Sequence, residues 1–199
     1  MKKLFESWNS YLLEIMDNPA ETNVGIDDPF ERIVFFEVGD KEYEITFGRE
    51  TISDIQWSVE FSIQDSPKNT PYVMQNINDM RLTSIVFATV LQEIKKFLSS
   101  RGDELVLLSM DADRKEPSRV RFYDFLMKRF SPKLREDGFV TGAMDTDSYR
   151  TNIIFNPDYL NSQPLTKLQR SDLMFIINNL TSGQEEVKKA FFNAGLRGL

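Results

Sequence analysis

The sequence of 199 residues contains neither cysteine nor histidine. The lack of cysteine excludes disulfide bonds, thiol nucleophiles and thiolate metal ligands. The lack of histidine excludes imidazole ligands and any catalytic triad with a histidine base. Any catalysis must therefore use carboxylates, tyrosine, serine or threonine, lysine, arginine, backbone groups or a bound cofactor, and we expect no resident metal ion.

Long apolar stretches are also missing. The chain has no run of about 18 apolar residues, no signal peptide and no lipidation motif, which predicts a cytoplasmic protein without membrane contact. Hydrophobic residues make up 41% of the chain and charged residues 28%. These values are typical of a globular protein and not of a disordered or fibrous one.

Negative charge predominates, with 31 acidic and 24 basic side chains and a formal net charge of −7. This sign argues against general nucleic-acid binding. The charge is unevenly spread, because residues 1–65 hold 15 acidic and 5 basic side chains whereas residues 111–135 hold 4 acidic and 8 basic ones. We expect the basic segment to balance the acidic first third, or to receive a phosphate-bearing ligand or an acidic partner.

Hydrophobic periodicity predicts a helix and three antiparallel strands in the first third. Apolar residues at helical spacing indicate a helix over Lys2–Met16, and Ala20–Pro29, which contains asparagine, glycine and consecutive aspartates, is expected to be a loop. Two strand-like runs, Ile33–Val38 and Tyr43–Phe47, are joined by a turn and predict a hairpin. In Ile55–Ile63 apolar and polar residues alternate without a break, the pattern of a half-buried strand.

The remainder of the chain alternates between helix and strand patterns. Residues 65–80 are rich in proline and asparagine and are expected to form a long loop. Four consecutive apolar residues, Leu105–Leu108, are typical of a strand buried on both faces. The elements predicted after the loop are a helix around Phe87–Leu98, a strand Glu104–Met110, a helix Pro117–Phe130, strands Phe139–Ala143 and Tyr149–Phe155, and tail helices around Leu168–Leu180 and Glu185–Leu196.

This order predicts an α/β (α+β) fold with a mixed, mostly antiparallel central sheet flanked by helices, because a helix between the meander and the next strand requires a crossover. We place the domain, with its N-terminal helix, at residues 1–163 and a C-terminal helical extension at residues 164–199. The extension carries the apolar segments Met174–Ile177 and Phe191–Phe192. We therefore expect it either to dock on the domain or to bind a protein partner.

A characteristic helix follows the buried strand Leu105–Leu108. Its sequence is Glu116-Pro117-Ser118-Arg119-Val120-Arg121-Phe122-Tyr123-Asp124-Phe125-Leu126, and Gly138-Phe139 comes later. This segment resembles the tyrosine segment and Gly-Phe pair of the acyl-CoA N-acetyltransferase superfamily, the GNAT fold. The resemblance implies a GNAT-like fold and transfer of acetyl from acetyl-CoA to an amine. It also implies that Tyr123 is the general acid, that Glu60 is the base and that Arg119 faces the cofactor.

The same resemblance assigns the cofactor's pyrophosphate to the segment Asn78–Ile85. In the family this loop is glycine-rich, so that backbone N–H groups approach the phosphates at a helix N-terminus. Here no glycine occurs between Gly48 and Gly102, so arginine and hydroxyl side chains would have to supply the hydrogen bonds. The predicted cofactor-binding residues of this segment are Arg81, Leu82, Thr83 and Ser84.

Each candidate residue also has a purely structural interpretation. Tyr123 is equally compatible with a core aromatic whose hydroxyl is satisfied at an edge, and Glu60 with a solvated strand carboxylate. Asp111 and Asp113, with Glu116, could hold a hard cation or form an acidic turn before a helix. Glu116 also replaces the asparagine usual in the GNAT family.

A second class of function stays open. The missing glycines and the apolar tail also fit a GNAT-like protein that has lost cofactor binding and acts as a structural or protein-interaction module. A third option is a small acidic inhibitor of a host enzyme, which the acidic first third suggests, and any protein partner is expected to bind through the C-terminal helices. The first eight residues and the histidine-free composition are similar to bacteriophage proteins, which predicts a host cytoplasm as the location.

Overall fold

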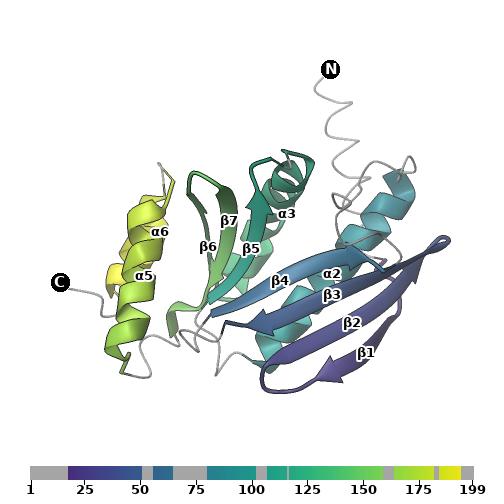
Figure 1. The fold of residues 1–199 in the computed structure, drawn as a ribbon, viewed down its shortest axis with the longest axis horizontal. Coiled ribbons are helices and arrows are strands. Elements are labelled where there is room, and N and C mark those ends of the chain that lie inside the picture. The colour runs from purple at the N-terminus through teal and green to yellow at the C-terminus, as the bar shows by residue number, and fades with distance from the viewer. Residues whose placement is uncertain are drawn as a thin grey trace. The chain divides into compact units, whose positions relative to one another are not determined.

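The computed structural model describes residues 18–50, 56–64, 80–101, 107–115, 117–158, 164–181 and 184–193. Seven strands form one sheet in the order β1-β2-β3-β4-β5-β7-β6 (Figure 1). The elements are β1 (Thr22–Asp27), β2 (Glu31–Val38), β3 (Lys41–Arg49), β4 (Gln56–Ile63), α2 (Met80–Ser100), β5 (Leu107–Asp113), α3 (Pro117–Glu136), β6 (Val140–Asp145), β7 (Tyr149–Phe155), α5 (Lys167–Asn179) and α6 (Glu185–Asn193). The predicted mixed, mostly antiparallel α+β fold is confirmed.

The chain divides into two compact units, residues 1–46 with 61–97 and residues 47–60 with 98–199. The helix predicted over Lys2–Met16 lies outside the described residues, as do residues 65–79 of the loop predicted over 65–80. No helix in the described ranges is long and apolar enough to cross a membrane.

Strand β1 lies where the sequence predicts a loop, so that prediction is wrong for Thr22–Asp27. β1 pairs antiparallel with β2, and the register shifts between Val24 and Ile26. A Cβ on Gly25 would come within 2.5 Å of the Phe35 ring, so any larger residue at this bulge would require that ring to move. Five of the six β1 residues are exposed, and the alternation that marks a half-buried strand is therefore absent. Backbone pairing with β2, and not residue propensity, makes this segment a strand.

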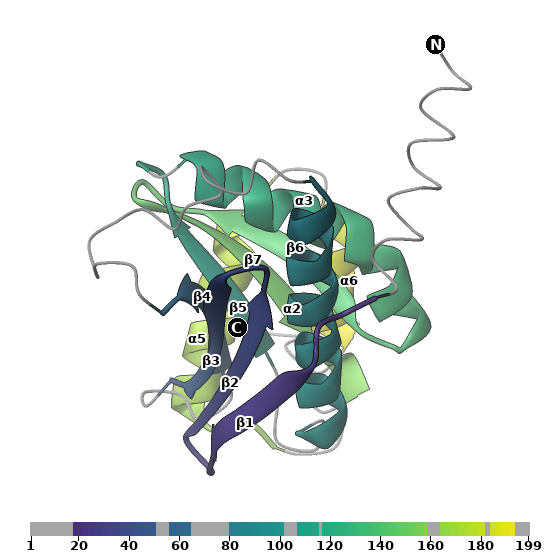
Figure 2. The same ribbon diagram turned by 90° about the vertical axis from the view of Figure 1, so that its right-hand side faces the viewer.

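In the first unit, α2 covers one face of the β2–β3 hairpin (Figure 2). The buried residues Val34, Phe36 and Val38 alternate along β2, and Arg32, on the same face, contacts α2. Gly39 closes the hairpin with φ of +68°, a conformation that favours glycine. The predicted hairpin and the alternating strand β4 are both confirmed.

A buried ion pair links α2 to the strands. Glu93 of α2 is fully buried, and its carboxylate accepts hydrogen bonds from Thr22 Oγ1 at 3.0 Å and from Lys96 Nζ at 2.6 Å. An Arg32 guanidinium nitrogen lies 3.7 Å from the same carboxylate. Because a buried charge is costly without partners, this group constrains how α2 sits on β1 and β2.

Ionisation of Tyr43 is expected to make the stability of the first unit fall with pH in the alkaline range. Its buried ring stacks with Phe36 and with Phe61, at centroid distances of 5.1 Å and 5.5 Å, and these two rings lie 6.4 Å apart. Burial, and then the Asp40 carboxylate, raise the pKa of the Tyr43 phenol above its ordinary value of 10.0. The folded state therefore favours the neutral phenol. The stability that this preference contributes is fully present below the unfolded-state pKa and is lost as pH rises through the folded-state pKa.

We expect Tyr43→Phe to flatten the decline in the free energy of unfolding between about pH 9 and about pH 11. Urea unfolding at several pH values measures this slope. Tyr149→Phe, which removes a hydroxyl from an exposed ring, should keep the slope of the parent protein. Equal slopes for the parent protein and Tyr43→Phe would contradict the assignment.

In the second unit, helices cover both faces of the β5–β7–β6 sheet. α3 contacts all three strands, whereas α5 and α6 contact β6 from the opposite face (Figure 1). The alternation along β6 separates the two faces: Thr141 Oγ1 donates to Ser131 Oγ of α3, and Gly142 faces Val187 of α6. This two-sided cover explains the nearly continuous apolar pattern of β5.

Helix α3 extends to Glu136, beyond the end predicted at Phe130. Pro132 lies inside the helix, where its missing N–H removes one backbone hydrogen bond. Leu134 is nevertheless almost fully buried, so packing of the last turns compensates for the lost bond. The turn predicted at Asp137-Gly138 is confirmed, with φ of +87° at Gly138.

The C-terminal helices dock on the second unit, one of the two outcomes predicted for them. A capping box at Thr166 starts α5, and Gln184 both accepts from the Ala143 N–H at 2.7 Å and donates to the Ala143 carbonyl at 3.0 Å. A Cβ on Gly142 would come within 2.6 Å of Gln184 Oε1, so the helices lie close to β6. The shared core consists of Leu107, Met144, Ile153, Phe155, Leu173, Ile176, Ile177, Leu180, Val187 and Phe191.

Candidate functional site

Tyr123, the predicted general acid, lies in the second turn of α3 and is only 3% exposed. Its ring packs against Phe122 at 5.3 Å between centroids. Arg119, one turn earlier, donates from Nε to the phenol oxygen at 3.4 Å and places its guanidinium 5.6 Å from the ring centroid. The structure therefore brings two predicted site residues, Tyr123 and Arg119, into direct contact.

Glu60, the predicted base, lies near the end of β4 and is exposed. Within the part of the chain that the structure describes, its carboxylate has no hydrogen bond or ion pair. This setting agrees with the solvated strand carboxylate that was the alternative interpretation, and it leaves the carboxylate accessible. No described contact joins Glu60 to Tyr123.

Within the described residues, the parallel pairing of β4 with β5 is short. It covers Gln56 to Ser58 on β4 and Leu107 to Ser109 on β5, while β5 stays paired with β7 as far as Asp113. Ser109 Oγ adds hydrogen bonds at the end of this pairing, donating to the Trp57 carbonyl and accepting from Gln56 Nε2. Beyond Ser58, therefore, Val59 and Glu60 of β4 are no longer paired with β5.

The four residues predicted to bind pyrophosphate are helical. α2 begins at Met80, so the expectation of a loop over this segment is wrong from that residue onward. The Ser84 side chain is 2% exposed, and Leu82 lies so close to Gly39 that a Cβ there would be 3.4 Å from Leu82 Cδ1. The side chains of Arg81 and Thr83 are outside the described residues. The first turn of a helix leaves its backbone N–H groups unpaired, and such groups bind phosphate.

Asp111 and Asp113, the alternative cation ligands, both accept hydrogen bonds from other groups of the protein. Thr151 Oγ1 donates a short hydrogen bond to Asp111, and the backbone N–H of Lys115 donates to Asp113 Oδ1 at 2.8 Å. Glu116 lies outside the described residues. Among the described residues, no group of three acidic side chains could hold a metal ion, and Asp113 serves as a turn-forming carboxylate.

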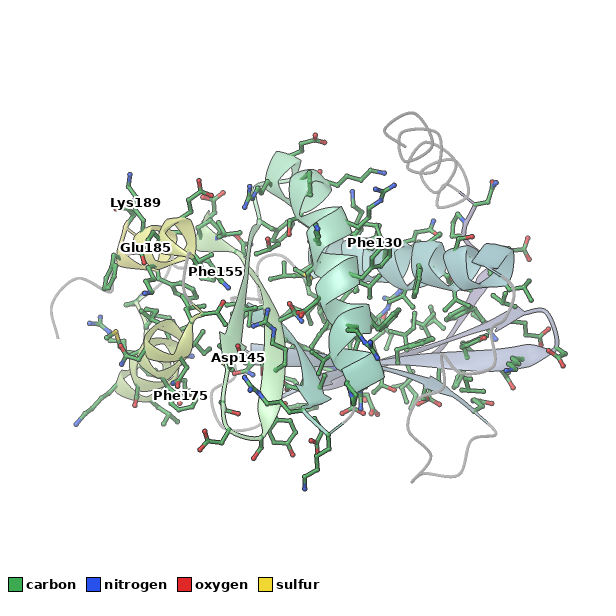
Figure 3. The ribbon with its side chains drawn as sticks, turned by 90° about the horizontal axis from the view of Figure 1, so that it is seen from above. Phe130, Asp145, Phe155, Phe175, Glu185 and Lys189 are labelled. Atoms are coloured by element: carbon green, nitrogen blue, oxygen red, sulfur yellow. The ribbon has the colours of Figure 1, made fainter. Side chains whose placement is uncertain are left out.

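The described residues form a charged pocket that the sequence patterns do not predict. It is an open pocket of about 680 Å³ in the second unit, bounded by the turn after β5, the start of α3 and the β6–β7 hairpin. The basic character of residues 111–135 was the available signal, but Asp145 and Arg150 come from a distant hairpin. Figure 3 shows Asp145 on β6. The lining residues are Arg114, Pro117, Val120, Arg121, Asp124, Asp145 and Arg150.

Two comparisons with known proteins give matches to different families. A structure similar to this chain is the ribosomal L7/L12 α-N-protein acetyltransferase RimL in its apo form, with 11% sequence identity, a TM-score of 0.33 and alignment over 63% of this chain and 59% of that one. A TM-score this low carries no argument about function. No curated protein gives a match.

The second match comes from the sequence itself. The profile of the phosphatidylinositol-specific phospholipase C X domain matches residues 54–164. That range includes β4, α2, β5, α3, β6 and β7. Since the matched range is more than half of the sequence, the chain belongs to the family of phosphatidylinositol-specific phospholipase C X domains.

Proposed function

We propose that the chain is a GNAT-like acyltransferase that moves an acetyl group from acetyl-CoA to an amine. The observation that carries this proposal is the short β4–β5 pairing, which ends at Ser58 and Ser109. Beside this point lies Glu60, and Tyr123 follows on the next helix after β5. The element order of meander, helix, strand, helix and strand pair supports the same function.

The proposed chemistry needs one proton acceptor and one proton donor. The amine nitrogen attacks the thioester carbonyl carbon, the new C–N bond forms and the C–S bond breaks. Glu60, an exposed carboxylate, takes the proton from the amine, and Tyr123 Oη gives a proton to the departing sulfur. Arg119, which contacts the Tyr123 hydroxyl, orients that donor. Acetyl-CoA supplies the activated acyl group.

We expect Tyr123→Phe to lower the acetylation rate by about 10²- to 10⁴-fold, the range that a general acid contributes. The rate is measured with acetyl-CoA and a panel of amines, and binding of acetyl-CoA by calorimetry. Tyr149→Phe is the matched control, because it removes a hydroxyl from an exposed tyrosine of the same unit. The melting temperature should change little for either variant, since Tyr123→Phe keeps the buried ring. Absence of binding at millimolar acetyl-CoA would contradict the proposal.

Family membership favours a second candidate, cleavage of a phosphodiester in an inositol phospholipid. The matched range includes the arginine-lined pocket, but the chain has no histidine, so proton transfer would depend on carboxylates such as Asp124 and Asp145. Release of water-soluble inositol phosphate from phosphatidylinositol vesicles tests this function. If the protein released inositol phosphate from these vesicles and transferred no acetyl group from acetyl-CoA, this function would replace the first proposal.

A non-catalytic protein-interaction role is the third candidate. Exposed apolar side chains on the C-terminal helices favour it, and Phe175 lies on the outer side of α5 (Figure 3). Leu168 and Phe192 are also exposed. This role would be supported over both reactions if the protein had neither activity but bound a protein partner, and if Phe175→Ser abolished that binding.

A further inference from the structure

The charged pocket is built by three segments that its own hydrogen bonds hold together. Arg114 lies in the turn after β5, where its backbone N–H donates to the Ser148 carbonyl of the β6–β7 hairpin at 2.9 Å. Arg121 and Asp124 come from the first two turns of α3. Arg150, the first residue after Tyr149 on β7, reaches Asp124 at 3.1 Å. All of these residues belong to the second unit.

The two carboxylates of the pocket are oriented by its arginines. One carboxylate oxygen of Asp145 lies 2.7 Å from a guanidinium nitrogen of Arg114, and the other lies 3.0 Å from Arg150 Nη1. Asp124 Oδ1 accepts from Arg150 Nε and from Asn152 Nδ2, both at 3.1 Å. Both oxygens of Asp145 and one oxygen of Asp124 are thus occupied, so these groups offer little further acceptor capacity.

Hydrogen-bond donors, in contrast, are in excess. Arg121 uses only Nε, which donates to the Pro117 carbonyl of its own helix at 3.1 Å, and its two terminal nitrogens have no described partner. Arg114 uses a single nitrogen on Asp145. With three guanidinium groups and two carboxylates, the pocket carries one net positive charge.

We propose that this pocket binds a phosphate monoester carried on a small organic group. Planar guanidinium groups donate in pairs to phosphate oxygens, and a phosphate monoester is close to doubly charged at neutral pH. A volume of about 680 Å³ exceeds that of a phosphate alone and is typical of a small-molecule site. Val120 and Pro117, which also line the pocket, would contact the organic part. The proposal does not depend on acyl transfer, because neither Tyr123 nor Glu60 lines the pocket.

Calorimetric titration with phenyl phosphate tests the site, and phenol, which lacks the phosphate, is the ligand control. We expect Arg121→Gln to weaken phenyl phosphate binding about tenfold or more, the loss of one charge-assisted hydrogen bond. Arg135→Gln removes the same charge about four turns further along α3 and should leave the affinity unchanged. Arg121 is exposed, so both variants are expected to fold, which their melting temperatures check.

Vesicles of phosphatidylcholine with phosphatidylinositol 4-phosphate separate the two sources of the ligand. If the protein binds phenyl phosphate but not these vesicles, the ligand of the pocket is a free small molecule. If it binds both, a lipid headgroup is also a ligand. Tyr123→Phe should bind phenyl phosphate like the parent protein, which separates this site from the acyltransferase proposal. No binding of phenyl phosphate at 10 mM, about the upper limit of useful affinity, would overturn the proposal. An equal loss in Arg121→Gln and Arg135→Gln would overturn it as well.

Discussion

Replacing Phe191 with alanine is expected to lower the free energy of unfolding by about 3–5 kcal/mol. The Phe191 ring is fully buried and stacks on Phe155, with 4.1 Å between the ring centroids. Its removal leaves a cavity between α6 and β7, where neighbouring side chains lose dispersion contacts. The effect should appear in the unfolding of the whole second unit, because α5, α6 and β5–β7 share one core.

The adjacent Phe192 provides a matched control. It has the same size and lies on the same helix, but it is 40% exposed. Phe192→Ala should change the free energy of unfolding by less than about 1 kcal/mol. Urea unfolding followed by circular dichroism measures both variants. If Phe191→Ala removed only the α6 signal and left the midpoint of the remaining transition unchanged, the C-terminal helices would not be part of the core.

Replacing Glu93 with alanine is expected to cost about 3 kcal/mol, the lower end of the range for breaking a buried ion pair, because the largely buried Arg32 loses one of its two carboxylate partners. Arg32 lies largely out of solvent, with 13% of its side chain exposed, and it has Asp27 and Glu93 as ion-pair partners. Arg32 Nε and Glu93 Oε2 have no hydrogen bond, so the pair is held by charge more than by ideal geometry. The loss of Glu93 therefore leaves Asp27, at the exposed end of β1, as the remaining ion-pair partner of Arg32.

A double replacement distinguishes this charge effect from a loss of packing. Arg32→Met with Glu93→Leu removes both charges and fills the space with apolar atoms, which is often neutral for buried ion pairs. We expect the double variant to be more stable than Glu93→Ala. Glu37→Ala, at an exposed position of β2, is the control for loss of a carboxylate and should be close to neutral. A double variant as unstable as Glu93→Ala would show that packing around Glu93 contributes more to stability than its charge does.

The predicted elements that proved right are those whose burial is periodic. The alternation from Ile55 to Ile63 predicted β4, and the strand Tyr149–Phe155 was predicted with the observed bounds. Burial on one face requires an apolar residue at each second position, so this information is local in the chain. β1 was missed because exposed edge residues are under no such constraint, and its pairing with β2 depends on a distant segment.

The candidate site was predictable only where a motif is contiguous. Arg119 and Tyr123 are four residues apart on one helix, and their contact follows from helical geometry. The phosphate pocket joins Arg121 with Asp145 and Arg150, and no sequence spacing signals that arrangement. Likewise the first turn of α2 replaced a predicted loop, since no glycine or proline in residues 72–85 marks where the helix begins.

By itself the sequence determined which chemistries are available and which faces of each element are apolar. It excluded thiol and imidazole chemistry, and it specified the hairpin, the buried strand and the helices through hydrophobic periodicity. Tertiary structure alone decided that α5 and α6 cover the sheet face opposite α3, that Glu93 lies buried beside Arg32, and that three arginines converge on one pocket. The physical reason is that periodicity records the burial of each residue, whereas a binding site depends on contacts between residues far apart in the chain.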